Sequence, residues 1–289
     1  MAQTTIIKAQ ANPSVTAADD LHFENDWAIR RPVWKALLDF SNPKTVAQTG
    51  ALTNGTPLVN LVEGGANGSV LGSFAAVHNG TIRSAGASNL AALVLPGDGA
   101  FYIPAATQKV LSIAWARAPK TGWAAGLFPA VVAVGTGANN ATQWCFYFQD
   151  ASGDGVMDRA TLRLRSGPVA WLDTVLLAGA DLDNLLDGNL HQIGMLMECD
   201  GTTGRATIYV DGVVVASASA PMTAFNRPAS SVAYAMNGGA AGLTSVTATA
   251  NAAQDMRVTR LGMVYLDGYD TTPEEVLALD AEAAAGFVS

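Results

Sequence analysis

The amino-acid sequence predicts an all-β protein, an antiparallel β-sandwich with few helices. The most informative segment is Asp187–Ala220, where three β-prone runs, His191–Glu198, Arg205–Val210 and Val213–Ala218, are separated by two short turns. Asp211-Gly212 joins the last two runs. Asp-Gly between β-rich runs is a strong hairpin signal, because a two-residue turn of this kind requires positive φ. The segment therefore predicts three consecutive antiparallel strands.

The same rhythm continues through most of the chain. From Gly99 onward, turn residues separate short apolar runs at close spacing, which is typical of a sandwich and leaves no room for the helices of βαβ units. Further strands are expected at 100–103, 109–116, 130–134, 143–148, 161–165, 171–177, 232–235 and 256–266. Before Gly99 the chain is rich in Gly, Asn, Ser and Ala, and its strand-like runs are 58–62, 70–74 and 90–95.

Two segments predict helices. In residues 26–40, Pro32 suits a first helical position and the apolar side chains that follow it fall on one helical face. The second helix begins near the C-terminus, where Thr272 and Glu275 form a capping box around Pro273. Its apolar side chains, Val276, Leu277 and Leu279, are expected to dock on the sandwich.

The first twenty residues are treated apart from the single sandwich domain expected over residues 21–289. Thr4–Lys8 is β-prone, and Asn12-Pro13 ends it. Residues 1–20 are therefore an N-terminal arm that pairs with a neighbouring subunit, or an edge strand of the same domain. The edge strand is preferred, because an unpaired Ile6-Ile7 strand would promote aggregation.

The composition is unusually poor in charge. Charged residues make up 14% of the chain, against about 25% in a typical soluble protein. Two interpretations stay open: a large core rich in small residues, or a surface that is covered by partners, since interfaces are depleted in charge. No run of about eighteen apolar residues occurs, so membrane insertion is not expected.

The charge balance also excludes some partners. The formal net charge is −8, the pI is about 4.7, and no basic cluster is present. Binding to nucleic-acid phosphates is therefore not expected. Cys145 and Cys199 stand on predicted strands and are expected to be reduced and buried. The opening residues, MAQTTIIKAQ, lack the apolar core of a signal peptide, so synthesis in the cytoplasm is expected.

Motifs of catalysis are missing from the sequence. It has no nucleophile elbow, P-loop, HExxH or CxxC pair, and its histidines, His22, His78 and His191, are far apart. The expected protein is not an enzyme.

The best metal candidate is the segment 150–158. Asp150, Ser152 and Asp154 imitate the first ligand positions of a calcium loop, and Asp158 adds a further carboxylate. Position 12 would be Thr161, so the usual bidentate Glu is missing. The alternative is an ordinary hairpin loop between two strands, which is preferred. Calcium is the one candidate cofactor.

A sugar platform requires an exposed aromatic ring. Trp123 lies in a predicted loop and is the candidate for glycan contact or for an interface with another subunit. For Trp123 a place in the core or in an interface is preferred over sugar contact, because large aromatic side chains are enriched at protein contacts. Trp144 and Trp171 lie in apolar strands and are expected in the core.

Several motifs together resemble a known family. Leu190-His191-Gln192, the run 206–216 around Asp211-Gly212, the run 257–266 and the helix start 272–276 look like the signature of laminin-G-like domains of the concanavalin A-like lectin/glucanase group. The resemblance covers residues 100–285. It implies a concanavalin A-like jelly roll with a short C-terminal helix, and it places His191 at the start of a strand.

The resemblance also permits a test for glucanase activity. Family 16 glucanases carry Glu-x-Asp-x-(x)-Glu on one strand, where the acids can flank the glycosidic bond. Glu24-Asn25-Asp26 and Glu198-Cys199-Asp200 begin this pattern, but neither continues to the last Glu. Hydrolysis by that motif is therefore not expected.

These observations lead to one functional hypothesis with two alternatives. We expect a non-enzymatic structural protein of a tailed-phage particle, in its tail, baseplate or capsid exterior, and hence a virion location. Its partners would be other virion proteins, further copies of itself and a host-surface glycan. The alternatives are a dedicated carbohydrate-binding lectin, which is compatible with the calcium that many lectins of this fold carry, and a glycan hydrolase.

Overall fold

The computed structural model of the protein describes most of the chain after residue 33. The described residues are 34–46, 51–72, 80–83, 91–95, 100–104, 107–123, 125, 127–135, 142–166, 170–226, 233–240 and 256–284; in residues 91, 127, 166, 170–175 and 237–240 only the backbone is considered. The predicted N-terminal arm or edge strand, residues 1–20, lies outside them.

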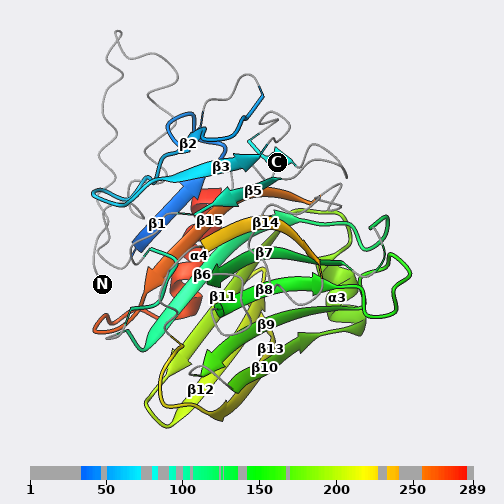
Figure 1. The fold of residues 1–289 in the computed structure, drawn as a ribbon. Coiled ribbons are helices and arrows are strands. Elements are labelled where there is room, and N and C mark those ends of the chain that lie inside the picture. The colour runs from blue at the N-terminus through cyan, green and yellow to red at the C-terminus, as the bar shows by residue number, and fades with distance from the viewer. Residues whose placement is uncertain are drawn as a thin grey trace.

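The described strands form two antiparallel sheets that are stacked as a sandwich (Figure 1). The seven-stranded sheet has the order β1 (Trp34–Asp39), β15 (Arg257–Tyr265), β6 (Lys109–Arg117), β11 (His191–Cys199), β12 (Thr203–Val210) and β13 (Val213–Pro221), with β4 (Ile82–Arg83) also paired to β15. The eight-stranded sheet has the order β10 (Ala170–Leu177), β9 (Arg159–Ser166), β8 (Thr142–Gln149), β7 (Leu127–Gly135), β14 (Ala233–Ala240), β5 (Ala91–Val94), β3 (Gly68–Gly72) and β2 (Pro57–Leu58). The predicted antiparallel sandwich is confirmed.

The main core lies between the two sheets. Alternation along β8 turns Trp144, Phe146 and Phe148 into it, and the two Phe rings meet edge to face with centroids 5.8 Å apart. From the opposite sheet, Met195 and Met197 of β11 fill the same layer. A second apolar cluster covers the outer face of the seven-stranded sheet, so several of its strands are buried on both faces.

The strand β1 corrects the first helix prediction. Residues 34–39 do not form a helix; they pair with β15, from Trp34 opposite Val264 to Asp39 opposite Arg260. Ala36 and Leu38 face the main core, whereas Trp34 and Leu37 belong to the outer cluster. A strand that is apolar on both faces has no period-two pattern, so its apolar positions also match a helical face.

Most of the predicted strands from residue 109 onward are confirmed with shifted ends, but the expected strand 100–103 is wrong. Phe101 and Ile103 instead lie in a bend that side chains of β8 hold: Trp144 Nε1 donates to the Phe101 carbonyl at 3.1 Å. The Gln143 amide exchanges two hydrogen bonds with the Ile103 backbone, at 2.7 and 2.8 Å. These bonds replace a strand ladder and satisfy the buried backbone.

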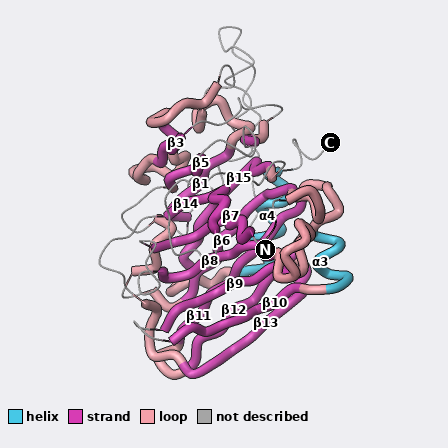
Figure 2. Tube along the Cα trace, turned by 45° about the vertical axis from the view of Figure 1, so that its right-hand side comes forward, coloured by secondary structure: helices cyan, strands magenta, loops and turns pink. Residues whose placement is uncertain are grey.

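Two helices are present in the described chain (Figure 2). The short α3 (Gly179–Leu185) was not predicted. The helix α4 (Pro273–Ala284) confirms the predicted capping box, because Glu275 N donates to Thr272 Oγ1 at 3.2 Å and Thr272 N donates to Glu275 Oε2 at 2.9 Å. No helix in the described part of the chain is long and apolar enough to cross a membrane.

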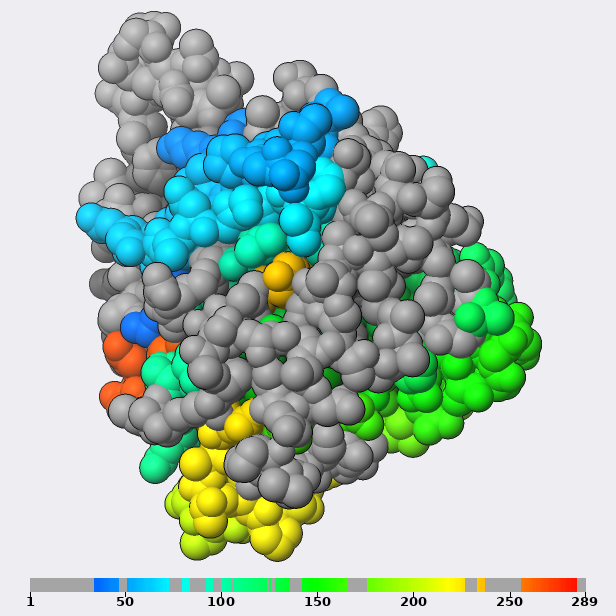
Figure 3. Space-filling model, viewed as in Figure 1, coloured from blue at the N-terminus to red at the C-terminus, as the bar shows by residue number. Residues whose placement is uncertain are grey.

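The helix α4 lies on the outer face of the seven-stranded sheet, where Val276 and Leu277 join the second cluster. In the space-filling view, β2 and β3 (blue and cyan) and β13 (yellow) lie at opposite ends of the visible face (Figure 3). Cys145 and Cys199 are buried and reduced, as predicted.

Candidate functional site

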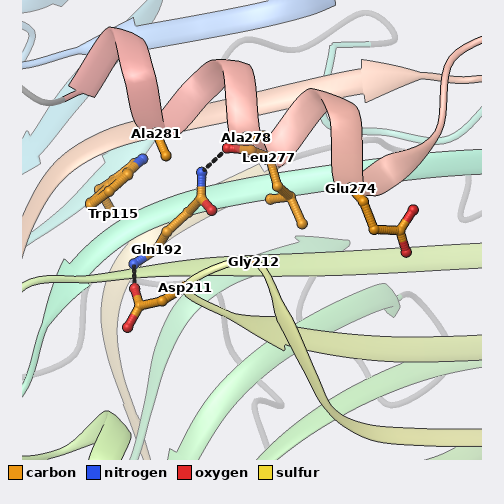
Figure 4. Close-up of a pocket in the computed structure, with 8 residues that line it drawn as sticks. All are labelled: Trp115, Gln192, Asp211, Gly212, Glu274, Leu277, Ala278 and Ala281. Carbon is orange, nitrogen blue, oxygen red and sulfur yellow. Dashed lines mark hydrogen bonds between the residues drawn. The ribbon is translucent and has the colours of Figure 1, made fainter.

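A hollow of about 260 Å³ lies between α4 and the turn that joins β12 to β13 (Figure 4). Leu277, Ala278 and Ala281 of α4 form one wall. The floor and the opposite side come from Trp115 of β6 and Gln192 of β11. Its remaining boundary is the turn itself together with Glu274 of the first helical turn.

The turn has the geometry that its sequence predicts. Asp211 has φ 50° and Gly212 has φ 77°, so both central residues are left-handed, as a type I′ hairpin requires. Asp211 is also tied to β11, because its Oδ1 accepts from Gln192 N at 2.9 Å and its own N–H donates to the Gln192 carbonyl at 2.9 Å. The hairpin tip is thus fixed beside the hollow.

His191 holds the same turn from the side. Its Nδ1 lies 2.7 Å from Asp211 Oδ2, and its Nε2 lies 3.0 Å from Asp187 Oδ1. The hydrogen bond to Asp211, assisted by Asp187, raises the pKa of His191 to about 9 against the opposing effect of burial. His191 is therefore a cation at neutral pH, and both ring nitrogens donate. Its role is structural, in agreement with its predicted place at the start of a strand.

A buried polar network supports the floor of the hollow. Asp280 of α4 is fully buried, and its Oδ2 accepts from Trp115 Nε1 at 2.7 Å and from Gln192 Nε2 at 2.9 Å. Its Oδ1 lies 2.9 Å from Arg260 Nε. Arg260 is itself only 1% exposed and forms a second ion pair with Asp39 of β1 at 3.2 Å. The network therefore joins the helix to four strands of the sheet, β6, β11 and β15 directly and β1 through Arg260.

Glu274 lies at the mouth of the hollow, where the Tyr209 hydroxyl donates to its Oε1 at 2.9 Å. Hydrogen bonds from its own backbone amide and from Tyr209 lower the pKa of Glu274. Burial and the adjacent carboxylate raise the pKa of Tyr209. Both groups hold fixed protonation states at neutral pH, with Glu274 ionised and Tyr209 neutral.

The carboxyl groups around the hollow are not tuned for acid catalysis. The pKa of Asp211 is lowered by its bonds with His191 and the Gln192 amide, although burial acts in the opposite direction. That of Asp187 is lowered by the Asn189 amide and by His191. A glycosidase needs one carboxylic acid with a raised pKa. The arrangement can therefore bind and orient a ligand, but its acids do not form such a pair.

The scan of family models found no matching family, and the search of curated proteins found no relative. Among solved structures, the binding domain of botulinum neurotoxin DC in complex with SialylT is similar, with a TM-score of 0.52 and 9% identity, over 80% of this chain and 50% of that chain. The chain has a lectin-like β-sandwich fold.

Two further structures agree. The same toxin binding domain in complex with rat synaptotagmin II has a TM-score of 0.53 and 11% identity, over 80% of this chain and 51% of that chain. The third structure is of botulinum neurotoxin type C, whose cell entry is described as dependent upon interaction with two ganglioside molecules. It has a TM-score of 0.53 and 10% identity, over 80% of this chain and 50% of that chain. The chain spans about half the length of these structures, and the likeness at this identity establishes the fold.

The predicted calcium segment is a hairpin loop between β8 and β9 whose carboxylates bond to its own backbone. Asp150 Oδ1 accepts from Gly153 N at 2.6 Å and Oδ2 from Gly155 N at 2.8 Å, while Ser152 Oγ lies 3.3 Å from Asp150. Asp158 Oδ2 accepts from Ser152 N at 2.8 Å, and Asp154 Oδ1 accepts from Val156 N at 2.9 Å. Within the described residues no group of three acidic, His or Cys side chains could hold a metal ion. Calcium binding here stays a prediction.

Trp123 is buried, so the hypothesis of an exposed ring for glycan contact is wrong, and the preferred core-or-interface interpretation is resolved in favour of the core. The ring is 6% exposed and belongs to the main core, and its Nε1 donates to the Pro119 carbonyl at 2.7 Å. Bridges from Pro119 to Asp187 and from Thr121 to Val156 fold the loop inward. Trp123 therefore offers no ring face for a sugar. Trp144 is in the core as predicted, and the side chain of Trp171 lies outside the described residues.

The acidic pairs that begin a glucanase motif are not brought together by the described structure. Glu198 pairs with Lys109 at 3.5 Å on the sheet, whereas Asp200 caps the next turn. Hydrogen bonds from the Thr202 side chain and from the Thr203 amide lower the pKa of Asp200 to about 2. Glu24 and Asp26 lie outside the described residues.

Sequence reasoning missed the residues that build the hollow. Trp115, Gln192 and Asp280 come from one strand, another strand and the C-terminal helix, and no local motif connects them. The single available signal was Asp280 itself, a charged residue on the apolar side of the predicted helix. A charge on a buried face requires a buried partner.

Proposed function

We propose that the protein is a non-enzymatic, lectin-like recognition module, carried on the exterior of a tailed-phage particle in its tail, baseplate or capsid. It binds other virion proteins and further copies of itself, and it contacts a host-surface glycan. The observation that carries the proposal is the two-layer antiparallel sandwich, shared with toxin domains whose solved complexes contain SialylT or synaptotagmin II.

Two properties of the chain support a binding role. Its charged residues amount to 14%, and protein interfaces are depleted in charge. The described carboxyl groups with shifted pKa values, which are Asp158, Asp187, Asp200, Asp211 and Glu274, all have them lowered. Lowered pKa values favour fixed anions over proton donors.

A glycan array with the full chain tests the recognition role, run in calcium and again with a chelator. Binding to a defined glycan class supports the lectin activity, and loss of binding with the chelator and in Asp150→Asn assigns calcium to the 150–158 loop. Release of reducing sugars from bound glycans would refute the non-enzymatic role. Absence of binding to every glycan would remove the glycan from the proposal.

The virion placement has its own test. Immunogold electron microscopy with an antibody against the chain is expected to label purified phage particles from the source cells at the tail, baseplate or capsid surface. Size-exclusion chromatography with light scattering measures self-association. Purified particles that lack the chain would refute the placement, whatever the glycan array reports.

A further inference from the structure

We propose that the hollow beneath α4 binds a primary alkylammonium group, such as the lysine side chain of a protein partner. The site is separate from any glycan contact and goes beyond the function proposed above. It rests on the buried acceptor that lines the hollow, on the charge of its rim and on its apolar wall.

The buried acceptor is Gln192 Oε1. The Gln192 side chain is 1% exposed, and its Nε2 donates at 2.9 Å to both the Leu277 carbonyl and Asp280 Oδ2. Both partners are acceptors, so the network fixes which end of the amide is the nitrogen. No described residue donates to the Oε1 atom, which points away from the helix backbone towards the Leu277 side chain (Figure 4). Because Gln192 lines the hollow, a ligand there can donate a hydrogen bond to this oxygen.

The rim of the hollow is negative. Asp211 and Glu274 are both ionised and lie on its boundary, contributed by the hairpin tip and by the helix. Among the described charged residues around them, carboxylates outnumber cations by four to two. The carboxylates are Asp187, Asp211, Glu198 and Glu274, and the cations are His191 and Lys109. A cation is therefore attracted, and an anionic sugar is repelled.

The wall of the hollow suits an aliphatic stem. Leu277, Ala278 and Ala281 present apolar surface, with the Trp115 indole beside them. Lysine side chains bury their methylene groups along such surfaces while the charged end meets polar groups. The volume of about 260 Å³ is below the roughly 300–1,000 Å³ of pockets for drug-sized ligands, and it accommodates one side chain better than a sugar chain.

The distribution of acceptors favours an ammonium over a guanidinium. Gln192, Asp211 and Glu274 come from three separate elements, so the acceptors that line the hollow do not form one planar fork. An ammonium has three rotatable donors, whereas a guanidinium is planar and prefers a bidentate partner. Both oxygens of Asp211 already accept, from Gln192 N and from His191, and Glu274 Oε1 accepts from Tyr209, so neither carboxylate offers a free fork.

Isothermal titration calorimetry with the full chain tests this site. The probe is Nα-acetyl-lysine N-methylamide, compared with its Nε-acetylated form, with the arginine analogue and with n-butylammonium. We expect the lysine probe to bind, with an affinity that falls as salt is raised, and the neutral acetylated probe to bind at least tenfold more weakly. Equal binding of the acetylated form, or tighter binding of the arginine analogue, would overturn the proposal. Butylammonium that binds like the lysine probe shows that the amine and stem suffice.

Matched variants locate the binding. Glu274→Gln removes the charge at the mouth but keeps an oxygen for Tyr209, and it is expected to weaken lysine binding at least fivefold. Glu282→Gln makes the same charge change at an exposed position of the same helix and should leave binding unchanged. Ala278→Phe, also at an exposed position, should block the hollow. Equal losses in Glu274→Gln and Glu282→Gln, or full binding in Ala278→Phe, would show that the amine binds elsewhere.

Discussion

Replacing Asp280 with alanine tests whether polar contacts, in addition to apolar burial, hold α4 on the sheet. Asp280 is fully buried; its Oδ2 accepts hydrogen bonds from Trp115 at 2.7 Å and from Gln192 at 2.9 Å, and its Oδ1 forms an ion pair with Arg260 at 2.9 Å. After the change, Gln192 still donates to the Leu277 carbonyl and Arg260 still pairs with Asp39. The indole N–H of Trp115 and one side of the guanidinium lose their partner.

The size of the effect follows from these losses. Removing one partner of a buried ion pair costs about 3–5 kcal/mol, because the remaining charge stays desolvated. Since Arg260 keeps Asp39, we expect Asp280→Ala to lower the free energy of unfolding by about 3 kcal/mol. That is a large fraction of the roughly 5–15 kcal/mol by which domains are stable. Asp280→Asn retains one acceptor and should cost about half as much.

Urea unfolding followed by circular dichroism and tryptophan fluorescence measures this loss. Glu282→Ala, on the exposed side of the same helix, is the control and should change stability by less than about 0.5 kcal/mol. A double-mutant cycle with Arg260→Met should give a coupling energy above about 1 kcal/mol. If Asp280→Ala costs less than about 1 kcal/mol, or if the cycle shows no coupling, the network does not hold the helix.

Three further outcomes are expected. The pKa of His191 is about 9 in the folded protein against 6.5 for a free imidazole, so its contribution to the free energy of unfolding is complete below pH 6.5 and is lost as the pH rises through 9. Because its carboxylate partners are partly exposed, stability should fall by about 1–2 kcal/mol between pH 6 and 10. His191→Gln should abolish that part of the pH dependence in urea unfolding. Gly194→Val should cost about 2 kcal/mol in the same assay, because a Cβ atom there already lies 3.0 Å from Leu277; an unchanged stability would mean that α4 is not tightly seated. Tyr209→Phe removes the hydroxyl that donates to Glu274, so NMR titration should find the pKa of Glu274 higher than in the parent protein, and an unchanged value would contradict that hydrogen bond.

The sequence was sufficient where structure is determined locally. The Asp211-Gly212 hairpin and the Thr272–Glu275 capping box depend on residues within a few positions of each other, and both are confirmed. β1 was mistaken for a helix because burial on both faces erases the two-residue alternation of a strand. The sequence left Trp123 between core and interface, because the distant bridges that fold its loop into the core have no local signal.

The candidate site could not be predicted from local sequence patterns. Gln192 and Asp280 are 88 residues apart in the chain, and Arg260 and Asp39 are 221 apart. Their meeting depends on the order of strands in the sheet and on where α4 settles. Neither follows from periodicity or motif spacing.

The guanidinium shared by Asp39 and Asp280 links the first described strand to the last helix. Losing the arginine alone leaves two buried carboxylates without their cation, and losing either acid removes one of the two ion pairs, so single substitutions at these positions should be selected against. Related chains are therefore expected to vary at positions 39, 260 and 280 together, with all three polar or all three replaced by apolar residues. Such joint variation would identify related proteins that keep this helix on the same face of the sheet, even where the rest of their sequences is no longer recognisably similar.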